Sequence, residues 1–266
     1  MKTIASCSFG KDSIAAILVA MEHGIKIDEV FYCRLMFDDK ISAEYPEHEQ
    51  FIHNIAIPKL QDEYGLKIVV VESKPYRDMF YRKFGSRSKR EGQFYGFPIV
   101  RGPWCNSGMK MQAIRKYLKT FGEYREIVGI AADETKRIEK KTVQCKILPL
   151  VDYGITEAMA YDICRKAGLL SPAYEQLNRQ RLGCWFCHNQ RIGELKALRK
   201  NSPDLWGYLL RMQADTTISF KSGATLFDLD KRFANEELKK EYKSGKDNDV
   251  LTDDPDNNIG SIKTDL

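Results

Sequence analysis

Short apolar runs alternate with amphipathic segments along the first two thirds of the chain. Residues 2–7 form an apolar run that predicts a buried strand, and the segment from about Ser13 to His23 predicts a helix ended by Gly24. The pattern predicts further strands at 28–37, 67–71, 125–131 and 147–150, and helices at 46–64, 107–121 and 156–167. Strands that alternate with helices indicate β–α–β units, and therefore an α/β fold on a parallel sheet.

The pattern changes after Gly168, where no further clear strand is found and helices and loops are expected. We therefore predict an α/β domain at 1–168 and a helical region at 169–243. The last segment, 244–266, is polar and almost without large apolar residues, and we expect it to be disordered.

The composition is that of a soluble globular protein, with 43% hydrophobic and 30% charged residues among 266. No run approaches the roughly 18 apolar residues of a membrane span. The first apolar run meets Lys11 and Asp12 too early to form a signal peptide. These features predict a cytoplasmic protein with reduced thiols and no membrane contact. They are compatible with a homodimer.

The net charge of +5 is unevenly distributed. Residues 244–266 hold six aspartates and two lysines, a charge of −4, so the other 243 residues carry +9. A basic body suits phosphate-rich ligands or nucleic acid. Within it, the basic residues of 82–90 lie among aromatic residues, which suits a nucleic acid such as tRNA or DNA. The alternative is a solvated loop with some aromatic rings folded inward.

The segment between the first strand and first helix, Ser8-Phe9-Gly10-Lys11-Asp12-Ser13, has the composition of a phosphate loop. At a helix N-terminus, free N–H groups and the helix dipole attract an anion. Gly10 allows a close backbone approach, Lys11 supplies charge, and the two serines supply hydroxyl donors. The alternative is a polar turn with a serine cap. Walker A spacing is absent, because Ala5 stands where that motif has glycine.

These six residues resemble the pyrophosphate-binding motif of the PP-loop superfamily, which comprises ATP pyrophosphatases, phosphoadenylyl-sulfate (PAPS) reductases and other adenine nucleotide α-hydrolase-like proteins. Three later segments are similar to motifs of its PAPS reductase branch, in the same order. They are Asp38-Asp39 with 44–47, the segment 128–137, and the segment 148–153. The resemblance covers residues 8–153 and implies a Rossmann-like sheet.

The resemblance also implies an enzyme that binds ATP, or a related adenine nucleotide, with Mg²⁺. It implies nucleotide contacts for Ser8, Phe9, Gly10, Lys11, Asp12, Ser13, Asp38, Asp39, Gly129 and Glu134. Lys11, Asp12, Asp133 and Arg137 are the expected catalytic residues. The planar fork of Arg137 also suits an oxyanion on chemical grounds, although a solvated surface position is the alternative.

A second candidate site contains cysteine. Cys184 and Cys187 have the C-x-x-C spacing that can bind one metal from a tight turn, and Cys105, after Trp104, is a natural third ligand. Three thiolates suit a 4Fe–4S cluster with one open iron, as in thiolation enzymes of the superfamily. With His188 or Cys145 as a fourth ligand they suit Zn²⁺, and free thiols without metal are a third alternative. Cys7, Cys33 and Cys164 lie in apolar segments and are expected in the core.

The chain departs from true sulfonucleotide reductases, which carry a C-terminal nucleophilic cysteine, because none follows Cys187. Their adjacent Cys-Cys pair is reduced to Cys105, and Ala131 replaces an arginine. The favoured hypothesis is therefore cleavage of the α–β phosphate bond to adenylate an acceptor for sulfur or nitrogen transfer. The alternatives are a true PAPS or adenylyl-sulfate reductase, and a non-enzymatic nucleotide- or nucleic-acid-binding module with structural zinc.

Overall fold

A parallel five-stranded sheet forms the centre of the computed structural model, which describes residues 1–98, 103–139, 145–177 and 179–249. The strands are β1 (Lys2–Cys7), β2 (Glu29–Arg34), β3 (Ile68–Glu72), β4 (Tyr124–Val128) and β5 (Lys146–Ile147). Their order is β3-β2-β1-β4-β5, and every pairing is parallel. The α/β class and the Rossmann-like parallel sheet are therefore confirmed.

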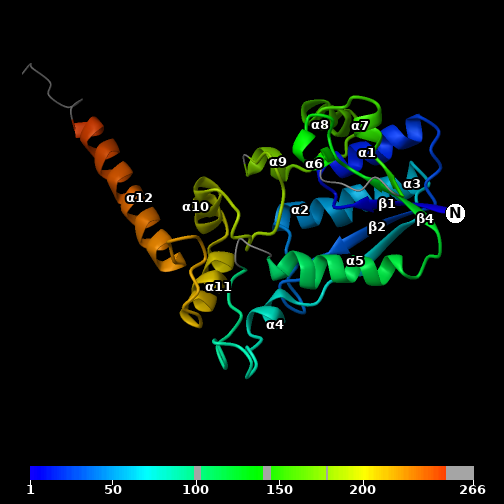
Figure 1. Ribbon diagram of the computed structural model, residues 1–266. Coiled ribbons are helices and arrows are strands. Elements are labelled where there is room, and N and C mark those ends of the chain that lie inside the picture. The colour runs from blue at the N-terminus through cyan, green and yellow to red at the C-terminus, as the bar shows by residue number, and fades with distance from the viewer. Residues whose placement is uncertain (99–102, 140–144, 178, 250–266) are drawn as a thin grey trace, which may run out of the picture.

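Helices cover both faces of the sheet, with α1, α7 and α8 on one side and α5 on the other (Figure 1). In the first 152 residues the helices are α1 (Lys11–Glu22), α2 (Pro46–Phe51), η1 (Ile52–Ala56), α3 (Ile57–Asp62), α4 (Tyr76–Phe80), η2 (Cys105–Lys110), α5 (Met111–Leu118), α6 (Thr135–Glu139) and α7 (Pro149–Asp152). Those that follow are α8 (Glu157–Lys166), α9 (Ala173–Gln176), α10 (Ile192–Asn201), α11 (Pro203–Ala214) and α12 (Leu226–Asp249).

The alternation of side chains along β1 and β2 separates two apolar cores. Ala5, Val30 and Tyr32 face the larger core with α1, α3 and α8, whereas Ile4 and Phe31 face α5. Strands buried on both faces are continuous apolar runs, which is why the sequence marked them clearly.

A third core joins segments on both sides of the expected boundary at residue 168. Phe37, Tyr76 and Phe80 from the first part share it with Trp185 and Phe233 from the second. The helical region is therefore packed onto the loops that follow β2 and β3, and only α12 extends away from the body (Figure 1).

Two expectations were wrong in part. The fifth strand ends at Ile147, and Pro149–Asp152 form the short helix α7, because proline suits the first turn of a helix and cannot donate to a sheet. The expected disorder from 244 begins too early, since α12 continues to Asp249. Once the packed residues Leu226 and Phe233 nucleate a helix, each further residue adds a hydrogen bond at little cost. Residues 250–266 lie outside the described part.

No helix within the described ranges is long and apolar enough to cross a membrane.

Candidate functional site

The loop after β1 lies where the sheet reverses its strand order. The chain passes from β1 to β2 and β3 on one side, then returns to place β4 on the other side of β1. Ligands of open parallel sheets bind in this crevice, at the carboxyl ends of the strands. The candidate phosphate loop 8–13 and Gly129, which follows β4, therefore meet at one point.

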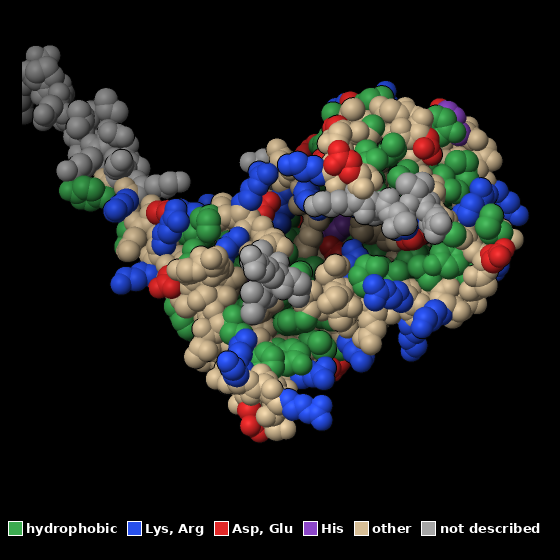
Figure 2. All heavy atoms as spheres, in the orientation of Figure 1, with side chains coloured by type: hydrophobic (Ala, Val, Ile, Leu, Met, Phe, Trp, Pro, Cys, Tyr) green, Lys and Arg blue, Asp and Glu red, His purple; other side chains and the backbone are tan. Residues whose placement is uncertain are grey.

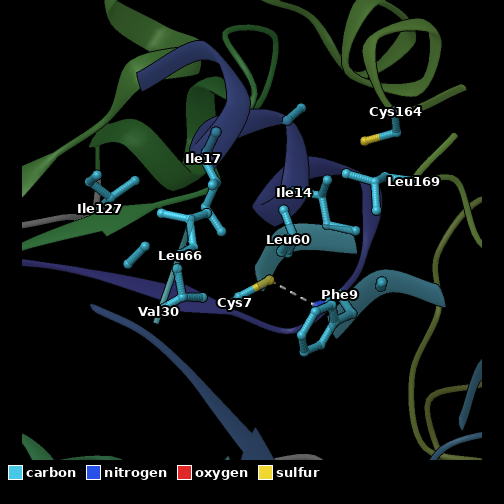
Figure 3. Close-up of a cluster of buried hydrophobic side chains, with 14 of the residues drawn as sticks. Cys7, Phe9, Ile14, Ile17, Val30, Leu60, Leu66, Ile127, Cys164 and Leu169 are labelled. Carbon is cyan, nitrogen blue, oxygen red and sulfur yellow. Dashed lines mark hydrogen bonds between the residues drawn. The ribbon is translucent and has the colours of Figure 1, made fainter. Parts of the chain in front are cut away.

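Phe9 gives this loop its shape but does not face a ligand. Its φ is +55°, a left-handed conformation that is costly for an aromatic residue. The ring is fully buried and packs edge-on against Tyr32 at 5.1 Å, and the N–H donates to Cys7 Sγ at 3.3 Å (Figure 3). The contribution of Phe9 to a nucleotide site is therefore limited to its backbone.

The two serines hold the loop in a turn. Ser13 Oγ donates to the Gly10 carbonyl at 2.9 Å and accepts the Ser8 N–H at 3.2 Å. The hydroxyls of Ser8 and Ser13 lie 3.4 Å apart. Gly10 has extended backbone angles and begins α1 without a side-chain cap. The first turn of α1 therefore remains open to an external acceptor.

Tyr174 of α9 completes the loop from a distant part of the sequence. Its hydroxyl accepts the N–H of Lys11 at 2.9 Å, and the ring is only 6% exposed. The N–H groups of Gly10 and Asp12 have no acceptor within the described residues. Two donors of the helix N-terminus are thus free for an anion, beside a hydroxyl whose own proton is available.

The sequence suggested that the side chain of Lys11 enters the crevice, but the structure places it elsewhere. It is buried and pairs with Asp12 at 2.8 Å and with Glu157 of α8 at 3.0 Å. Burial alone would lower its pKa, but the hydrogen bonds and charges of Asp12 and Glu157 outweigh burial and raise it. Lys11 is a permanent cation that holds α8 against α1.

Asp12 lines the crevice, and Gly129 packs against its backbone. Burial raises the pKa of Asp12, Lys11 opposes that shift, and the charges of Glu157 and Glu134 add to it. A Cβ on Gly129 would lie 2.4 Å from the Asp12 carbonyl oxygen, closer than atoms can approach. The crossing of β4 and α1 therefore requires glycine.

The segment after β4 supplies a tethered arginine. Arg137 Nη1 contacts both carboxylate oxygens of Glu134, at 2.7 and 2.8 Å, and Glu134 accepts the Ala131 N–H. Arg137 lines the crevice. Asp133 instead accepts the Glu157 N–H at 3.1 Å, at the start of α8, and does not line the crevice.

Asp38 and Asp39 also lie away from the crevice. Asp38 accepts the N–H groups of Lys40 and Ile41 in the turn after β2 and lies 3.6 Å from Arg77. Burial would raise the pKa of Asp38, but these N–H groups and Arg77 lower it. The structure therefore gives Asp38 a role in the turn, while the nucleotide contacts of Asp38 and Asp39 stay a prediction.

The crevice is a cavity of about 260 Å³ that joins the phosphate loop to the cysteine motif. Figure 2 shows a hollow in the middle of the molecule, with lysine and arginine side chains around it. Its walls include the predicted Ser8, Gly10, Asp12, Ser13, Gly129 and Arg137, and also Glu44, His48, Lys110, Tyr174, Arg181 and Cys184. Lys110 and Tyr174 were missed because neither belongs to a local motif.

Burial favours the neutral form of two ionisable groups that line the cavity, Glu44 and His48, and so shifts their pKa values in opposite directions. It raises the pKa of Glu44 to about 7, with Lys110 lowering and Glu49 raising it further. It lowers the pKa of His48 to about 4, so the imidazole is neutral at pH 7. The 4.0 Å approach of His48 Nε2 to Glu44 is therefore no ion pair at neutral pH.

The structure gathers the three predicted cysteine ligands in one region. Burial raises the pKa of Cys105 to about 11, and the nearby charge of Cys187 adds to the shift. The pKa of Cys184 is raised by burial and by Glu44, Cys187 and Cys105. As they are placed, however, no three His, Cys, Asp or Glu side chains of the described ranges converge to hold a metal ion.

The chemistry of the groups around these thiols suits a metal centre that prefers sulfur ligands. Burial raises the pKa of Tyr76, and the charges of the nearby Cys105, Cys184 and Cys187 add to the shift. Its buried hydroxyl has no partner in the described part of the chain. The buried Trp104 Nε1 and His188 Nε2 also lack partners within the residues that the structure describes. Burial lowers the pKa of His188, which favours the neutral imidazole that ligates metals.

The remaining cysteines lie elsewhere. Cys7, Cys33 and Cys164 are buried, at 3%, 8% and 0% exposure, which confirms their place in the core. Cys145 is exposed and precedes β5, at the amino ends of the parallel strands. Its alternative role as a fourth metal ligand is therefore wrong, because the cysteine site lies beyond the carboxyl ends.

Comparison with known proteins finds distant similarities. No family model matches the chain. It is 25% identical over 211 residues to the uncharacterized protein MJ0066 of Methanocaldococcus jannaschii, covering 75% of this chain and 38% of that protein. It is 24% identical over 210 residues to MJ0973 of the same organism, covering 76% and 45%. The chain thus spans less than half the length of these curated relatives.

Among solved structures, the U34-tRNA thiolase NcsA from Methanococcus maripaludis, with its 4Fe–4S cluster, is similar at a TM-score of 0.41 and 15% identity. The similarity covers 80% of this chain and 72% of that one. Similarity at this level assigns no activity to the present chain.

Proposed function

We propose that the chain is a PP-loop enzyme of the PAPS reductase type that binds ATP, or a related adenine nucleotide, with Mg²⁺. It cleaves the α–β phosphate bond and adenylates an acceptor, which then receives sulfur or nitrogen. The observation that carries the proposal is the cavity that joins the open N-terminus of α1 to Cys184.

In this proposal the phosphates bind the free N–H groups of Gly10 and Asp12 and the hydroxyl of Ser8, while Ser13 holds the loop in shape through its hydrogen bond to the Gly10 carbonyl. Arg137, held by Glu134, stabilises charge that develops as pyrophosphate leaves. Lys11 is a positioning residue: its ion pairs hold the loop in place, and it does not touch the ligand. Asp12 lines the same cavity and would supply a carboxylate to a nucleotide-bound Mg²⁺.

Cys105, Cys184 and Cys187 would hold the metal centre, with His188 as a fourth ligand if the metal is zinc. A 4Fe–4S cluster on three thiolates supplies an open iron that can carry sulfur, whereas zinc supplies a structural link. Purification without oxygen should therefore yield about one cluster or one zinc ion per chain. Cys184→Ser should lose the metal and Cys145→Ser should keep it; equal metal content in both variants would contradict the assignment.

The alternative of a sulfonucleotide reductase requires a nucleophilic thiolate in the chain or a partner. Burial raises the pKa of Cys105 to about 11, so this thiol is almost fully protonated at neutral pH. A protonated thiol is a weak nucleophile, which argues against Cys105 as the attacking group. Sulfite release from PAPS with thioredoxin as reductant would support the alternative instead.

The activity is tested by ATP–pyrophosphate exchange and pyrophosphate release in the presence of candidate acceptors. Arg137→Ala should reduce turnover by at least about tenfold, since one donor to a developing oxyanion is worth roughly 10²–10³ in rate. Lys136→Ala removes the same charge from the adjacent exposed position outside the cavity and should have no effect. Nucleotide binding without pyrophosphate release would favour a binding module, and equal turnover in both variants would remove Arg137 from the site.

We further propose a nucleic acid, such as tRNA or DNA, as the acceptor. Residues 82–95 form a small hairpin in which Lys83 pairs with Phe94 and Phe84 with Glu91. Arg82, Lys83 and Arg90 lie over the rings of Tyr95, Phe94 and Phe84, at 4.6 to 5.8 Å. Such aromatic and basic surfaces suit single strands, and a groove along α5 with Lys74, Arg115, Lys116 and Lys119 adds positive charge.

A further inference from the structure

A second cavity is lined by the segment that leads into the cysteine motif. Its volume is about 380 Å³, and it shares Gln180, Arg181 and Cys184 with the nucleotide crevice. Arg179, Arg191 and Glu194 belong to this second cavity alone. The stretch 180–184 therefore lines both cavities, and the proposed nucleotide chemistry uses only one of them.

The second cavity carries an excess of guanidinium groups. Arg179, Arg181 and Arg191 line it together with one carboxylate, Glu194. That carboxylate accepts the backbone N–H of Arg191 at 2.8 Å, at the start of α10. None of these arginines forms an ion pair with an Asp or Glu in the part of the chain that is described. Three guanidinium groups therefore face a single carboxylate among the described residues of this cavity, and none of the three is paired with it.

Arg179 is buried and held in place by its neighbours, so its charge is part of a preformed site. It is only 6% exposed, and its guanidinium lies 4.1 Å from the centre of the Tyr45 ring. Its Nη2 donates to Gln190 Oε1 at 2.8 Å and to the Tyr45 hydroxyl, while Nε is buried and has no partner among the described residues. A buried cation without a counter-ion is costly, so its retention calls for an anionic ligand.

The geometry points to a binding site for a tetrahedral oxyanion in this cavity, held by Arg179, Arg181 and Arg191 beside Cys184 and Cys187. Guanidinium forks match phosphate-like oxygens in bidentate geometry. A terminal phosphate and a sulfur oxyanion such as thiosulfate share this chemistry. Because Arg181 lines both cavities, the oxyanion and the nucleotide would both lie against the 180–184 segment.

The site goes beyond the proposed function and does not depend on ATP chemistry. Its test is calorimetric titration of the full chain, without nucleotide, with inorganic phosphate and separately with thiosulfate at constant ionic strength. We expect saturable binding of at least one of them, and the tighter one identifies the source of the oxyanion. Binding of neither would overturn the proposal.

Arg191→Gln should weaken this binding by at least about tenfold, because a lost hydrogen bond to a charged group costs that much or more. Lys200→Gln makes the same change of charge on the exposed end of α10 and should leave binding unchanged. Arg179→Lys keeps the charge but removes the fork, and should also weaken binding. If Arg137→Ala abolishes binding and Arg191→Gln does not, the anion lies at the phosphate loop and the proposal fails.

Discussion

His48 shows at the residue scale how burial decides the properties of a group whose sequence context gives no warning. It is 1% exposed, it lines the nucleotide crevice, and its Nδ1 lies 2.9 Å from Ser171 Oγ. Its lowered pKa of about 4 means that the folded chain binds the proton more weakly than the unfolded chain. His48 therefore contributes stability above pH 6.5 that is lost as the pH falls toward 4.

The prediction is a change in the stability difference between the wild-type chain and His48→Asn. From pH 7 to pH 4, the wild type should lose about 3 kcal/mol of unfolding free energy relative to the variant, because about 2.5 pKa units are involved. Denaturant unfolding at several pH values measures it. Taking the difference cancels the opposite contribution of Glu44, whose raised pKa favours the folded state at low pH. A pH-independent difference would contradict the buried neutral imidazole.

The residues of the sequence motifs differ in whether the motif alone predicts where the side chain lies. The serines, Gly10, Asp12 and Arg137 lie in or beside the cavity where the resemblance put them, because local turn geometry and a helix N-terminus determine their direction. Lys11 does not, because the partner that redirects it, Glu157, comes from α8. The charge of Lys11 was visible in the sequence, but its ion pair was not.

At the scale of elements, the site depends on the packing of β4 against the first turn of α1. Gly129→Ala would place a Cβ 2.4 Å from the Asp12 carbonyl oxygen and 2.7 Å from Ser13 Cα, both backbone atoms that cannot rotate away. We expect a lower melting temperature and nucleotide binding weakened by at least about tenfold, since a 1.4 kcal/mol loss already has that effect.

The matched control for this change is Gly122→Ala, where an added Cβ meets nothing within 4 Å. Thermal unfolding and equilibrium nucleotide binding are measured for both variants. Equal effects would show that general destabilisation, and not displacement of α1, causes the loss.

The connection from α9 to the cysteine motif contributes residues to both the nucleotide crevice and the second cavity. Tyr174 caps α1, Arg179 and Arg181 line the second cavity, and Cys184 borders both. This stretch has no apolar periodicity, so sequence analysis placed it only in a helical and loop-like region. Its contacts with residues more than 100 positions away organise it.

Across the whole molecule, the +9 charge of residues 1–243 predicts salt-sensitive binding of nucleic acid. Arg87→Ala with Lys89→Ala, at exposed hairpin positions, should weaken tRNA or single-stranded DNA binding and lower the salt slope by about two. Lys231→Ala with Lys239→Ala removes equal charge from α12 and should have little effect. Equal slopes in both double variants, or no binding at low salt, would remove the hairpin from the interface.

The sequence by itself determined the α/β class, the order of the main strands and helices, the buried cysteines and the turn between β1 and α1. These depend on local periodicity and on residues adjacent in the chain, which physical chemistry translates directly into strands, turns and helix ends. Tertiary structure alone decided that Lys11 pairs with Glu157, that Tyr174 caps α1 and that Cys145 lies far from the other site cysteines. It also brought Arg179, Arg181 and Arg191 around one cavity, because packing over long sequence separations determines which charges meet and which stay unpaired.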